Sequence, residues 1–493
     1  MVQFVHIDAR TAADMRRQGV DPHKMEQSTG IVLYYLYTSL PDPPVSAVPR
    51  LSALRASDAE DRISGLPFAL LRNIVSRLPV KDAARTAALS RRWRPVWAAT
   101  ASPCAQTPPA SSRRSPASSP RTLRAVHLVC GYLDAHQRQL VRWIQTLADR
   151  GLSELVLVNR PWPLETPLPA TLFGISTLTR LYLGIWKFPD TSGLPRGAGA
   201  EPVFLHLREL VLSAVLIENR DLDFLLAGSP VLETLGIQGS KNGLRLRLVG
   251  QRIRCVQICV CHMESIAVVN TPSLERLIVC GSMTCGGSCI RVKIGKAPKL
   301  RVLGYLEPGV HMLEIRNTVI TAGLRASPST MAPNVKILGL HVRSGVRNDV
   351  TMLSTFLRCF PNIETLHIMS AKTDEVTGKV NLKFWQEAGP IESIRSCIKE
   401  MTFREFQGER SGIAFLKFFF QSAKALKKAV IVATRGSFTF IGSAISKVHS
   451  LTPDNWASNC SVFVYESSGA EGDELWNFQK GFDFSISDPF VYH

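Results

Sequence analysis

The chain has 493 residues, 45% of them hydrophobic, and a formal charge of +18 at neutral pH. Its length allows two or three domains, and its hydrophobic content excludes a disordered chain. The strongest early apolar run, 31–40, is too short to span a bilayer, and no N-terminal segment has the pattern of a secretion signal. We therefore expect an intracellular protein of the cytoplasm, the nucleus or both, with no membrane partner. Its eleven cysteines, an odd number, favour reduced thiols over a disulfide framework.

Residues 1–60 form an N-terminal extension that we leave unassigned. The apolar run 31–40 suits either a short strand or a helix docked on another element. Four prolines within 41–50 predict an extended spacer. No pattern in this extension indicates a function.

Residues 61–97 begin with the spacing of a short amphipathic helix. Its apolar residues recur every three to four positions, as on one helix face: Leu70, Leu71, Ile74 and Leu78. Pro67 suits the first turn of this helix, and Pro79 ends it because proline has no N–H to donate.

Two more short helices are predicted after Pro79. Asp82 is a fair N-cap for the second helix, and Ser90 can cap the third. Trp93 and Trp97, four residues apart, share one face of this third helix as large apolar anchors. Three helices in under forty residues bury too little apolar surface to be a secure independent fold, so we interpret them as a docking module that needs a partner. Its eight basic residues against two acidic ones favour an acidic partner.

This segment closely resembles the plant F-box in three ordered motifs: D-R-I-S-x-L-P, L-L-x-x-I-x-x-R-L-P-x-K-D-A-x-R-T and L-S-x-R-W-R-x-x-W. F-box families use this unit to bind the acidic Skp-type adaptor of a cullin-RING ubiquitin ligase. By this resemblance, the positions that face the adaptor or support that face are Leu66, Pro67, Leu70, Leu71, Ile74, Leu78 and Pro79. The F-box core positions are Leu89, Trp93 and Trp97.

One feature departs from the family pattern. The family usually has acidic residues after the Leu-Pro pair, where this chain has Phe68 and Ala69. Each acid lost from a helix start removes on the order of 0.3–1 kcal/mol of favourable dipole interaction, which the motif is expected to survive. The alternative is a plain helical hairpin inside a larger core, which explains the apolar spacing but not the joint order of the motifs.

A flexible linker and then a repeat array follow. Residues 101–124 hold five prolines, six serines and four arginines, a composition that cannot form a packed core. After about 125, the pattern apolar-x-x-Leu-x-apolar recurs at intervals that mostly fall within the 20–29 residues of leucine-rich repeats. It starts at Leu152, Leu178, Leu207, Leu232, Ile253, Leu274, Leu300, Val335 and Ile363. Such repeats stack into one solenoid.

The connections between repeats predict a mixed convex side. Residues 222–226 suit a short helix, whereas the alternating runs 244–248, 290–294 and 313–315 suit strands. Farther on, residues 397–432 predict a strand, a phenylalanine-rich helix and a second strand. This unit, with C-I-K-E-M-T-F-x-x-F-x-G, resembles the FBD domain of plant F-box/leucine-rich-repeat proteins, and we expect it to cap the open end of the solenoid.

The predicted fold is therefore α/β, with a small three-helix F-box, a solenoid with a mixed helix and strand convex side, and a C-terminal α+β cap. The predicted boundaries are 1–60 for the extension, 61–100 for the F-box, 101–124 for the linker, 125–390 for the solenoid, 391–435 for the FBD-like cap and 436–493 for an unassigned C-terminal segment.

Catalytic and metal-binding patterns give no competing hypothesis. The cysteines between 255 and 289 lack paired C-x-x-C spacing, so we expect apolar fillers rather than a zinc site. No nucleophile elbow, phosphate-binding glycine loop or H-E-x-x-H motif occurs, so we expect a non-catalytic chain without a cofactor. The net charge is the one feature that suggests binding to polyanions. No dense basic run or RNA-binding signature supports specific nucleic-acid recognition.

The resemblance implies a substrate-recognition subunit of an SCF-type ubiquitin ligase, in which the F-box docks the Skp-type adaptor and the repeats hold an unknown target protein. The alternative is a leucine-rich-repeat scaffold whose F-box is non-functional after the loss of acids at 68 and 69. Neither the target nor a small molecule that completes the binding face can be read from the repeats, because their specificity lies in positions between the leucines.

Overall fold

The protein is represented by a computed structural model that describes residues 9–25, 66–68, 70, 71, 75, 92–96, 125–131, 133–160, 165–195, 201–284, 286–371, 380–452, 460–467 and 478–491. The chain divides into two compact units, residues 1–230 and 231–493, which are treated one at a time. The apolar run 31–40, the spacer 41–50 and the linker 101–124 lie outside the described residues.

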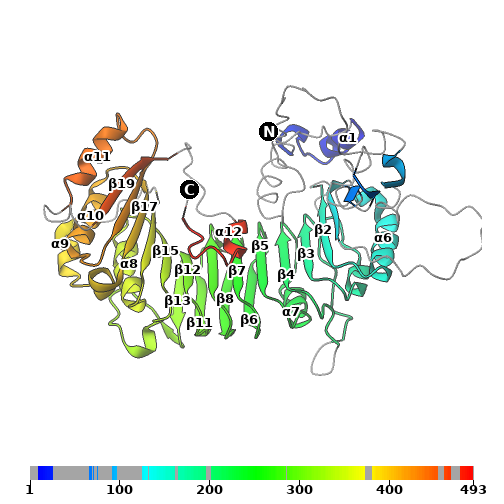
Figure 1. The fold of residues 1–493 in the computed structure, drawn as a ribbon, viewed down its shortest axis with the longest axis horizontal. Coiled ribbons are helices and arrows are strands. Elements are labelled where there is room, and N and C mark those ends of the chain that lie inside the picture. The colour runs from blue at the N-terminus through cyan, green and yellow to red at the C-terminus, as the bar shows by residue number, and fades with distance from the viewer. Residues whose placement is uncertain are drawn as a thin grey trace, which may run out of the picture. The chain divides into compact units, whose positions relative to one another are not determined.

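Unit 1, residues 1–230, contains a parallel sheet (Figure 1). Its strands are β1 (Ala125–Gly131), β2 (Glu154–Asn159), β3 (Arg180–Gly184) and β4 (Glu209–Ser213), paired in this order. Its described helices are α1 (Ala9–Arg17), η1 (Asp134–His136), α6 (Gln137–Asp149), η2 (Ala170–Gly174) and α7 (Asn219–Ala227). Helix α7 confirms the short helix predicted at 222–226, and α6 buries Leu140, Ile144 and Leu147 as one apolar face.

Unit 2 contains a parallel ladder of its own with more strands. In order of pairing they are β5 (Thr234–Gln238), β7 (Cys255–Cys259), β9 (Arg276–Cys280), β12 (Val302–Leu306), β15 (Ile337–Val342), β16 (Thr365–Ser370), β17 (Glu400–Phe406), β18 (Lys428–Ala433) and β19 (Ser461–Glu466). We call this ladder the main sheet of unit 2.

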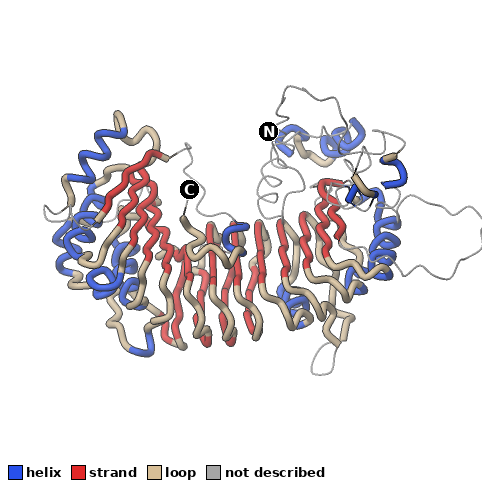
Figure 2. The backbone as a smooth tube through the Cα atoms, viewed as in Figure 1, coloured by secondary structure: helices blue, strands red, loops and turns tan. Residues whose placement is uncertain are grey.

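The connections of unit 2 change type along the chain (Figure 2). A second sheet contains β6 (Leu244–Val249), β8 (His262–Asn270), β10 (Met283–Thr284), β11 (Ile290–Lys296), β13 (His311–Ile315) and β14 (Thr318–Val319). The helices are η3 (Pro328–Thr330), α8 (Arg347–Cys359), α9 (Leu382–Glu387), η4 (Ser393–Cys397), α10 (Arg410–Ser422), α11 (Ile441–His449) and α12 (Phe478–Phe482). The predicted strands at 244–248, 290–294 and 313–315 are confirmed, and so is the mixture of helices and strands. The sequence patterns did not predict α8.

The repeat pattern fixes where each strand begins. All nine predicted repeat starts lie two residues before the first residue of a strand, from Leu152 before β2 to Ile363 before β16. These nine residues are buried, because the chain turns inward before each strand and packs the repeat onto its neighbour. The regular offset is what keeps the strands in register.

The FBD-like segment does not end the ladder, so the prediction that it caps an open end was wrong. Ile398, Met401 and Phe403 repeat the apolar spacing across β17, and Leu426, Ala429 and Ile431 repeat it across β18. Strand β19 then pairs along the whole of β18. Within unit 2, helices α8, α9 and α10 lie on one side of β15 to β17, and the C-terminal segment lies on the other (Figure 1).

Candidate functional site

The described part of the segment 66–96 contains a small apolar core. Leu71, Val75, Trp93 and Val96 form one buried cluster, and the partly buried Leu66 packs against it. Leu71 and Val75 are four residues apart and Trp93 and Val96 three apart, so each pair shares one helix face. Arg92 donates a hydrogen bond of 2.8 Å from its guanidinium to the carbonyl of Leu66, which ties the two ends of the segment together.

The same segment leaves large apolar side chains in solvent. Phe68 is 46% exposed and Leu70 is 50% exposed, and Pro67 beside them is also exposed. They lie at the start of the helical turn that buries Leu71. An isolated exposed leucine is ordinary, but exposed apolar side chains at 67, 68 and 70 beside a four-residue core suit contact with another protein.

The predicted adaptor-facing residues therefore fall into two groups. Pro67 and Leu70 are accessible, whereas Leu71 is fully buried and can only support the face from beneath. Trp93 is buried, as expected for a core residue. Five of the predicted residues lie outside the described part of the chain: Ile74, Leu78, Pro79, Leu89 and Trp97.

The sequence analysis missed Val75, Val96 and the exposure of Phe68. Val75 lies one turn after Leu71, and Val96 lies three residues after Trp93, so helical spacing from a residue already assigned could have found both. The exposure of Phe68 had no comparable signal, because an aromatic residue in the first turn of a helix fits either a buried or an accessible position.

A second candidate surface is one face of the main sheet of unit 2. The register aligns Gly236, Gln257 and Ile278 across β5, β7 and β9. Since side chains alternate between the two faces of a strand, these residues share a face that the intervening residues do not. Residues 478–491 lie on this face, as a hydrogen bond of 2.9 Å from Gln257 Nε2 to the carbonyl of Phe478 shows. We call this face the tail face and residues 478–491 the tail.

Four of the five described cysteines between 255 and 289 are buried among apolar side chains, as predicted. Cys255, Cys259, Cys261 and Cys280 are buried, whereas Cys289 is exposed. Burial raises the pKa of the Cys255 and Cys259 thiols to about 12, so both stay protonated and unreactive. Among the residues that the structure describes, no group of three or more histidine, cysteine, aspartate or glutamate side chains is placed to hold a metal ion. No described helix is both long and apolar enough to cross a bilayer.

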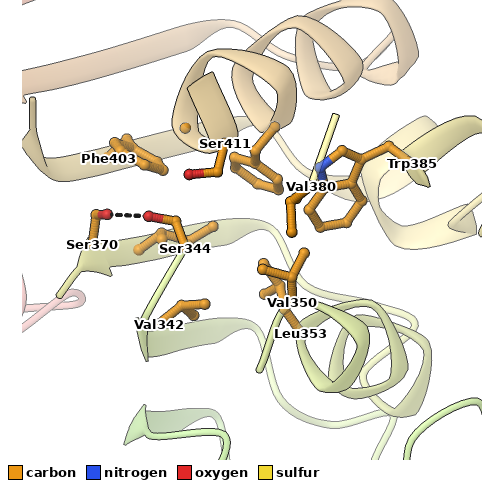
Figure 3. A pocket seen from close by; sticks show the side chains of 12 residues that line it. Val342, Ser344, Val350, Leu353, Ser370, Val380, Trp385, Phe403 and Ser411 are labelled. Carbon is orange, nitrogen blue, oxygen red and sulfur yellow. Dashed lines mark hydrogen bonds between the residues drawn. The ribbon is translucent and has the colours of Figure 1, made fainter. Parts of the chain in front are cut away.

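A small cavity in unit 2 lies between β15, β16, β17 and the helices beside them (Figure 3). Its lining is mostly apolar, with Val350, Leu353 and Trp385 among it. The hydroxyls of Ser344 and Ser370 lie 2.7 Å apart, and Ser344 also donates to Glu409 at 3.2 Å. Because these polar groups satisfy one another, we interpret the cavity as a packing gap of the core.

Sequence models of three domain families match this chain. The F-box domain matches residues 63–99, the repeats described as "FBD-associated F-box protein At5g56370, LRR repeats" match residues 140–368, and FBD matches residues 386–431. The three matches follow one another in the order in which the apolar cluster, the repeated strands and the strands β17 and β18 appear in the structure.

Relatives from Arabidopsis thaliana carry the same domain names as these family matches. F-box/LRR-repeat protein At3g59200 is 33% identical over 198 residues, which cover 36% of each chain. F-box/FBD/LRR-repeat protein At1g13570 is 28% identical over 36% of this chain and 44% of its own. Putative F-box/LRR-repeat protein At5g02930 is 22% identical over 80% of this chain and 78% of its own. The chain thus spans less than half the length of the first two relatives.

The fold and these matches define an F-box protein with leucine-rich repeats. The chain carries matches to F-box, leucine-rich-repeat and FBD domains in this order, and it is similar to F-box/LRR-repeat and F-box/FBD/LRR-repeat proteins of Arabidopsis thaliana.

Proposed function

We propose that this chain is the substrate-recognition subunit of an SCF-type cullin-RING ubiquitin ligase, acting inside the cell. Its F-box docks a Skp-type adaptor, and its repeats hold a target protein. The observation that carries the proposal is the arrangement at residues 66–71, where Leu70 is half exposed beside a fully buried Leu71 in a segment that matches the F-box.

In this proposal the F-box contributes adaptor binding and the repeats contribute target binding. A docked apolar side chain loses its water, and burying a leucine stabilises a complex by roughly 1.5–3 kcal/mol. The F-box core beneath it fixes the direction in which the side chain points. The chain itself supplies no chemistry in this proposal: it raises the local concentration of target lysines near a separate conjugating enzyme, which is catalysis by proximity.

The experiment compares two aspartates in the same helical turn. Leu70→Asp places a charge in the proposed docking face, where desolvating an unpaired carboxylate is costly, so co-purification with the Skp-type adaptor should be lost. Phe68→Asp adds the same charge at a position where the family usually carries an acid, and near the start of a helix that charge is favourable. Because Phe68 is exposed beside Leu70 but lies where the family tolerates an acid, Phe68→Asp should weaken adaptor binding much less than Leu70→Asp does.

Equal adaptor binding by Leu70→Asp and wild type would refute the docking face. Failure of the wild-type chain to bind the adaptor would instead favour a leucine-rich-repeat scaffold with a non-functional F-box, which the loss of acids at 68 and 69 makes the runner-up.

A further inference from the structure

The tail passes over successive strands of the main sheet of unit 2. Phe478 meets β5 at Gly236 and β7 at Gln257, and residues 480–486 meet β9 at Arg276. Asp488 and Phe490 together reach β12, β16 and β17. At the usual strand spacing of about 4.8 Å, the seven strands from β5 to β17 span about 29 Å. A short peptide segment thus lies along a row of side chains contributed by successive repeats.

Arg276 binds the main chain of the tail rather than its side chains. Its guanidinium donates to the carbonyls of Lys480, Gly481, Asp483 and Ile486. These carbonyls lie at and beyond the end of α12, where a helix leaves its acceptors unpaired and a positive charge is favourable. Such contacts select a helical turn followed by a non-helical turn, whatever its side chains are.

Aromatic side chains of the tail supply its anchors. The Arg254 guanidinium lies 3.7 Å from the centre of the Phe484 ring, a cation–π contact. Phe490 is fully buried in a cluster with Ile278, Val302, Tyr305 and Ile337. Its ring centre is 4.9 Å from that of Tyr305, in an edge-to-face arrangement.

Two glycines give the fit its selectivity. A Cβ on Gly236 would lie 2.4 Å from the Phe478 ring, so β5 must lack a side chain where Phe478 docks. A Cβ on Gly481 would lie 2.2 Å from the Gln257 side chain, so the tail must also lack one at this position. The tail and the sheet therefore fit each other as a ligand fits its site.

The site nonetheless leaves polar atoms unpaired under the tail. Tyr305 Oη and His367 Nδ1 are buried, and neither has a hydrogen-bond partner within the described part of the chain. Each such atom costs roughly 1–3 kcal/mol. A ligand that formed hydrogen bonds with these two atoms would gain binding free energy that the tail does not, and this gain would help it to displace the tail.

We propose that the tail is an internal ligand that occupies the target-binding groove of this chain. The target is a protein segment with the same chemistry: a phenylalanine-bearing helical turn with a glycine near its end, followed by a non-helical stretch of turns that contains Asp-Pro-Phe. Such a segment competes with the tail for the tail face. The inference rests on the proposed function in treating the repeats as the target-binding part, but its test involves no adaptor, so each can fail without the other.

The test uses the full chain and a fluorescent peptide with the sequence of residues 478–491. In the wild type the attached tail competes at high effective concentration, so the peptide should bind weakly. Phe478→Ala combined with Phe490→Ala removes two anchors of the attached tail but leaves the tail face intact. This released variant should bind the wild-type peptide about tenfold or more tightly than the wild-type chain does, because the competition is weakened.

Two matched controls locate the binding. A peptide carrying Gly481→Ala should lose the affinity for the released variant, because its Cβ meets Gln257. Arg276→Lys within the released variant should lose it as well, because lysine keeps the charge but not the fork of donors.

Equal peptide binding by the wild type and the released variant would overturn the proposal, and so would a folded released variant that binds no peptide. If the released variant is unfolded, saturating peptide should restore its thermal unfolding transition. Absence of this rescue would show that the tail is a fixed part of the fold and would also overturn the proposal.

Discussion

The carboxylate of Asp488 lies 2.8 Å from Nε2 of His367, a residue 121 positions earlier in the chain. The other carboxylate oxygen of Asp488 accepts the N–H of Phe490 at 3.0 Å. Burial tends to raise the pKa of Asp488, but attraction by His367 and these hydrogen bonds outweigh it and hold the pKa below its usual value. One side chain thus both shapes the tail and fastens it to β16.

This relationship predicts a difference between two aspartates of the tail. The carboxylates of Asp483 and Asp488 each accept the N–H of the residue two positions later. The Asp488 carboxylate also bonds to a side chain of the main sheet, whereas Arg276 bonds to the main-chain carbonyl of Asp483, which Asp483→Ala keeps. Asp488→Ala should lower the free energy of unfolding by about 1.5–3 kcal/mol, because a charged hydrogen bond is lost. Asp483→Ala should cost less. Chemical denaturation of both variants measures this difference, and equal losses would contradict the role of His367.

The fit of Phe478 against β5 predicts an effect of one added methyl group. Gly236→Ala should displace the Phe478 ring and speed amide hydrogen exchange in residues 478–486, because a Cβ there would lie 2.4 Å from the ring. Gly193→Ala is the control, because a Cβ at Gly193 would meet nothing within 4 Å. Unchanged exchange in the Gly236→Ala tail would mean that Phe478 does not hold it in place.

The repeat strands could be predicted because their signal is local. One apolar residue two positions before each strand, followed by two more across it, sets both the start and the register of β2 to β16. The same signal runs through Ile398 and Leu426, but the prediction treated that region as a separate cap because its motif resembles the FBD domain.

The tail could not be placed from the sequence, because its hydrogen bonds to the sheet join residues 86 to 226 positions apart. Nothing near Arg276 indicates that it binds carbonyls some 200 residues later, and nothing near Phe490 indicates a pocket at Tyr305. In the F-box, helical spacing identified Leu70 and Leu71 as a pair. Which of them is buried depends on where Trp93 and Val96 pack, and that is a tertiary property.

The F-box core predicts that stability and docking can be separated. Trp93→Ala should destabilise the segment by about 3–5 kcal/mol, because it leaves a cavity beside Leu71 and Val75. It should therefore abolish adaptor binding together with protection from proteolysis. Leu70→Asp should abolish adaptor binding and leave protease resistance unchanged, since Leu70 is half exposed. Retained adaptor binding by Trp93→Ala would contradict the assignment of this core.

A buried histidine predicts acid sensitivity of unit 2. Burial lowers the pKa of His311 from its ordinary 6.5 to about 4, against the opposing pull of Glu307, and the Nδ1 atom accepts the Glu307 N–H at 2.8 Å. Since the unfolded chain binds the proton more readily, stability should fall as the pH drops from 6.5 toward 4, by roughly 3 kcal/mol at most.

His311→Asn retains a hydrogen-bond acceptor and cannot titrate in this range. Its unfolding free energy, measured by urea denaturation between pH 7 and pH 4, should therefore fall less steeply than that of the wild type. Identical slopes for the two proteins would show that His311 is not held neutral by burial.

The most direct measurement of the central claim is reconstitution of the wild-type chain with a Skp-type adaptor, a cullin and its RING subunit, followed by size-exclusion chromatography. The account predicts a single complex in which this chain co-elutes with the cullin only when the adaptor is present. Elution of this chain alone, while the adaptor and the cullin assemble with each other, would contradict it.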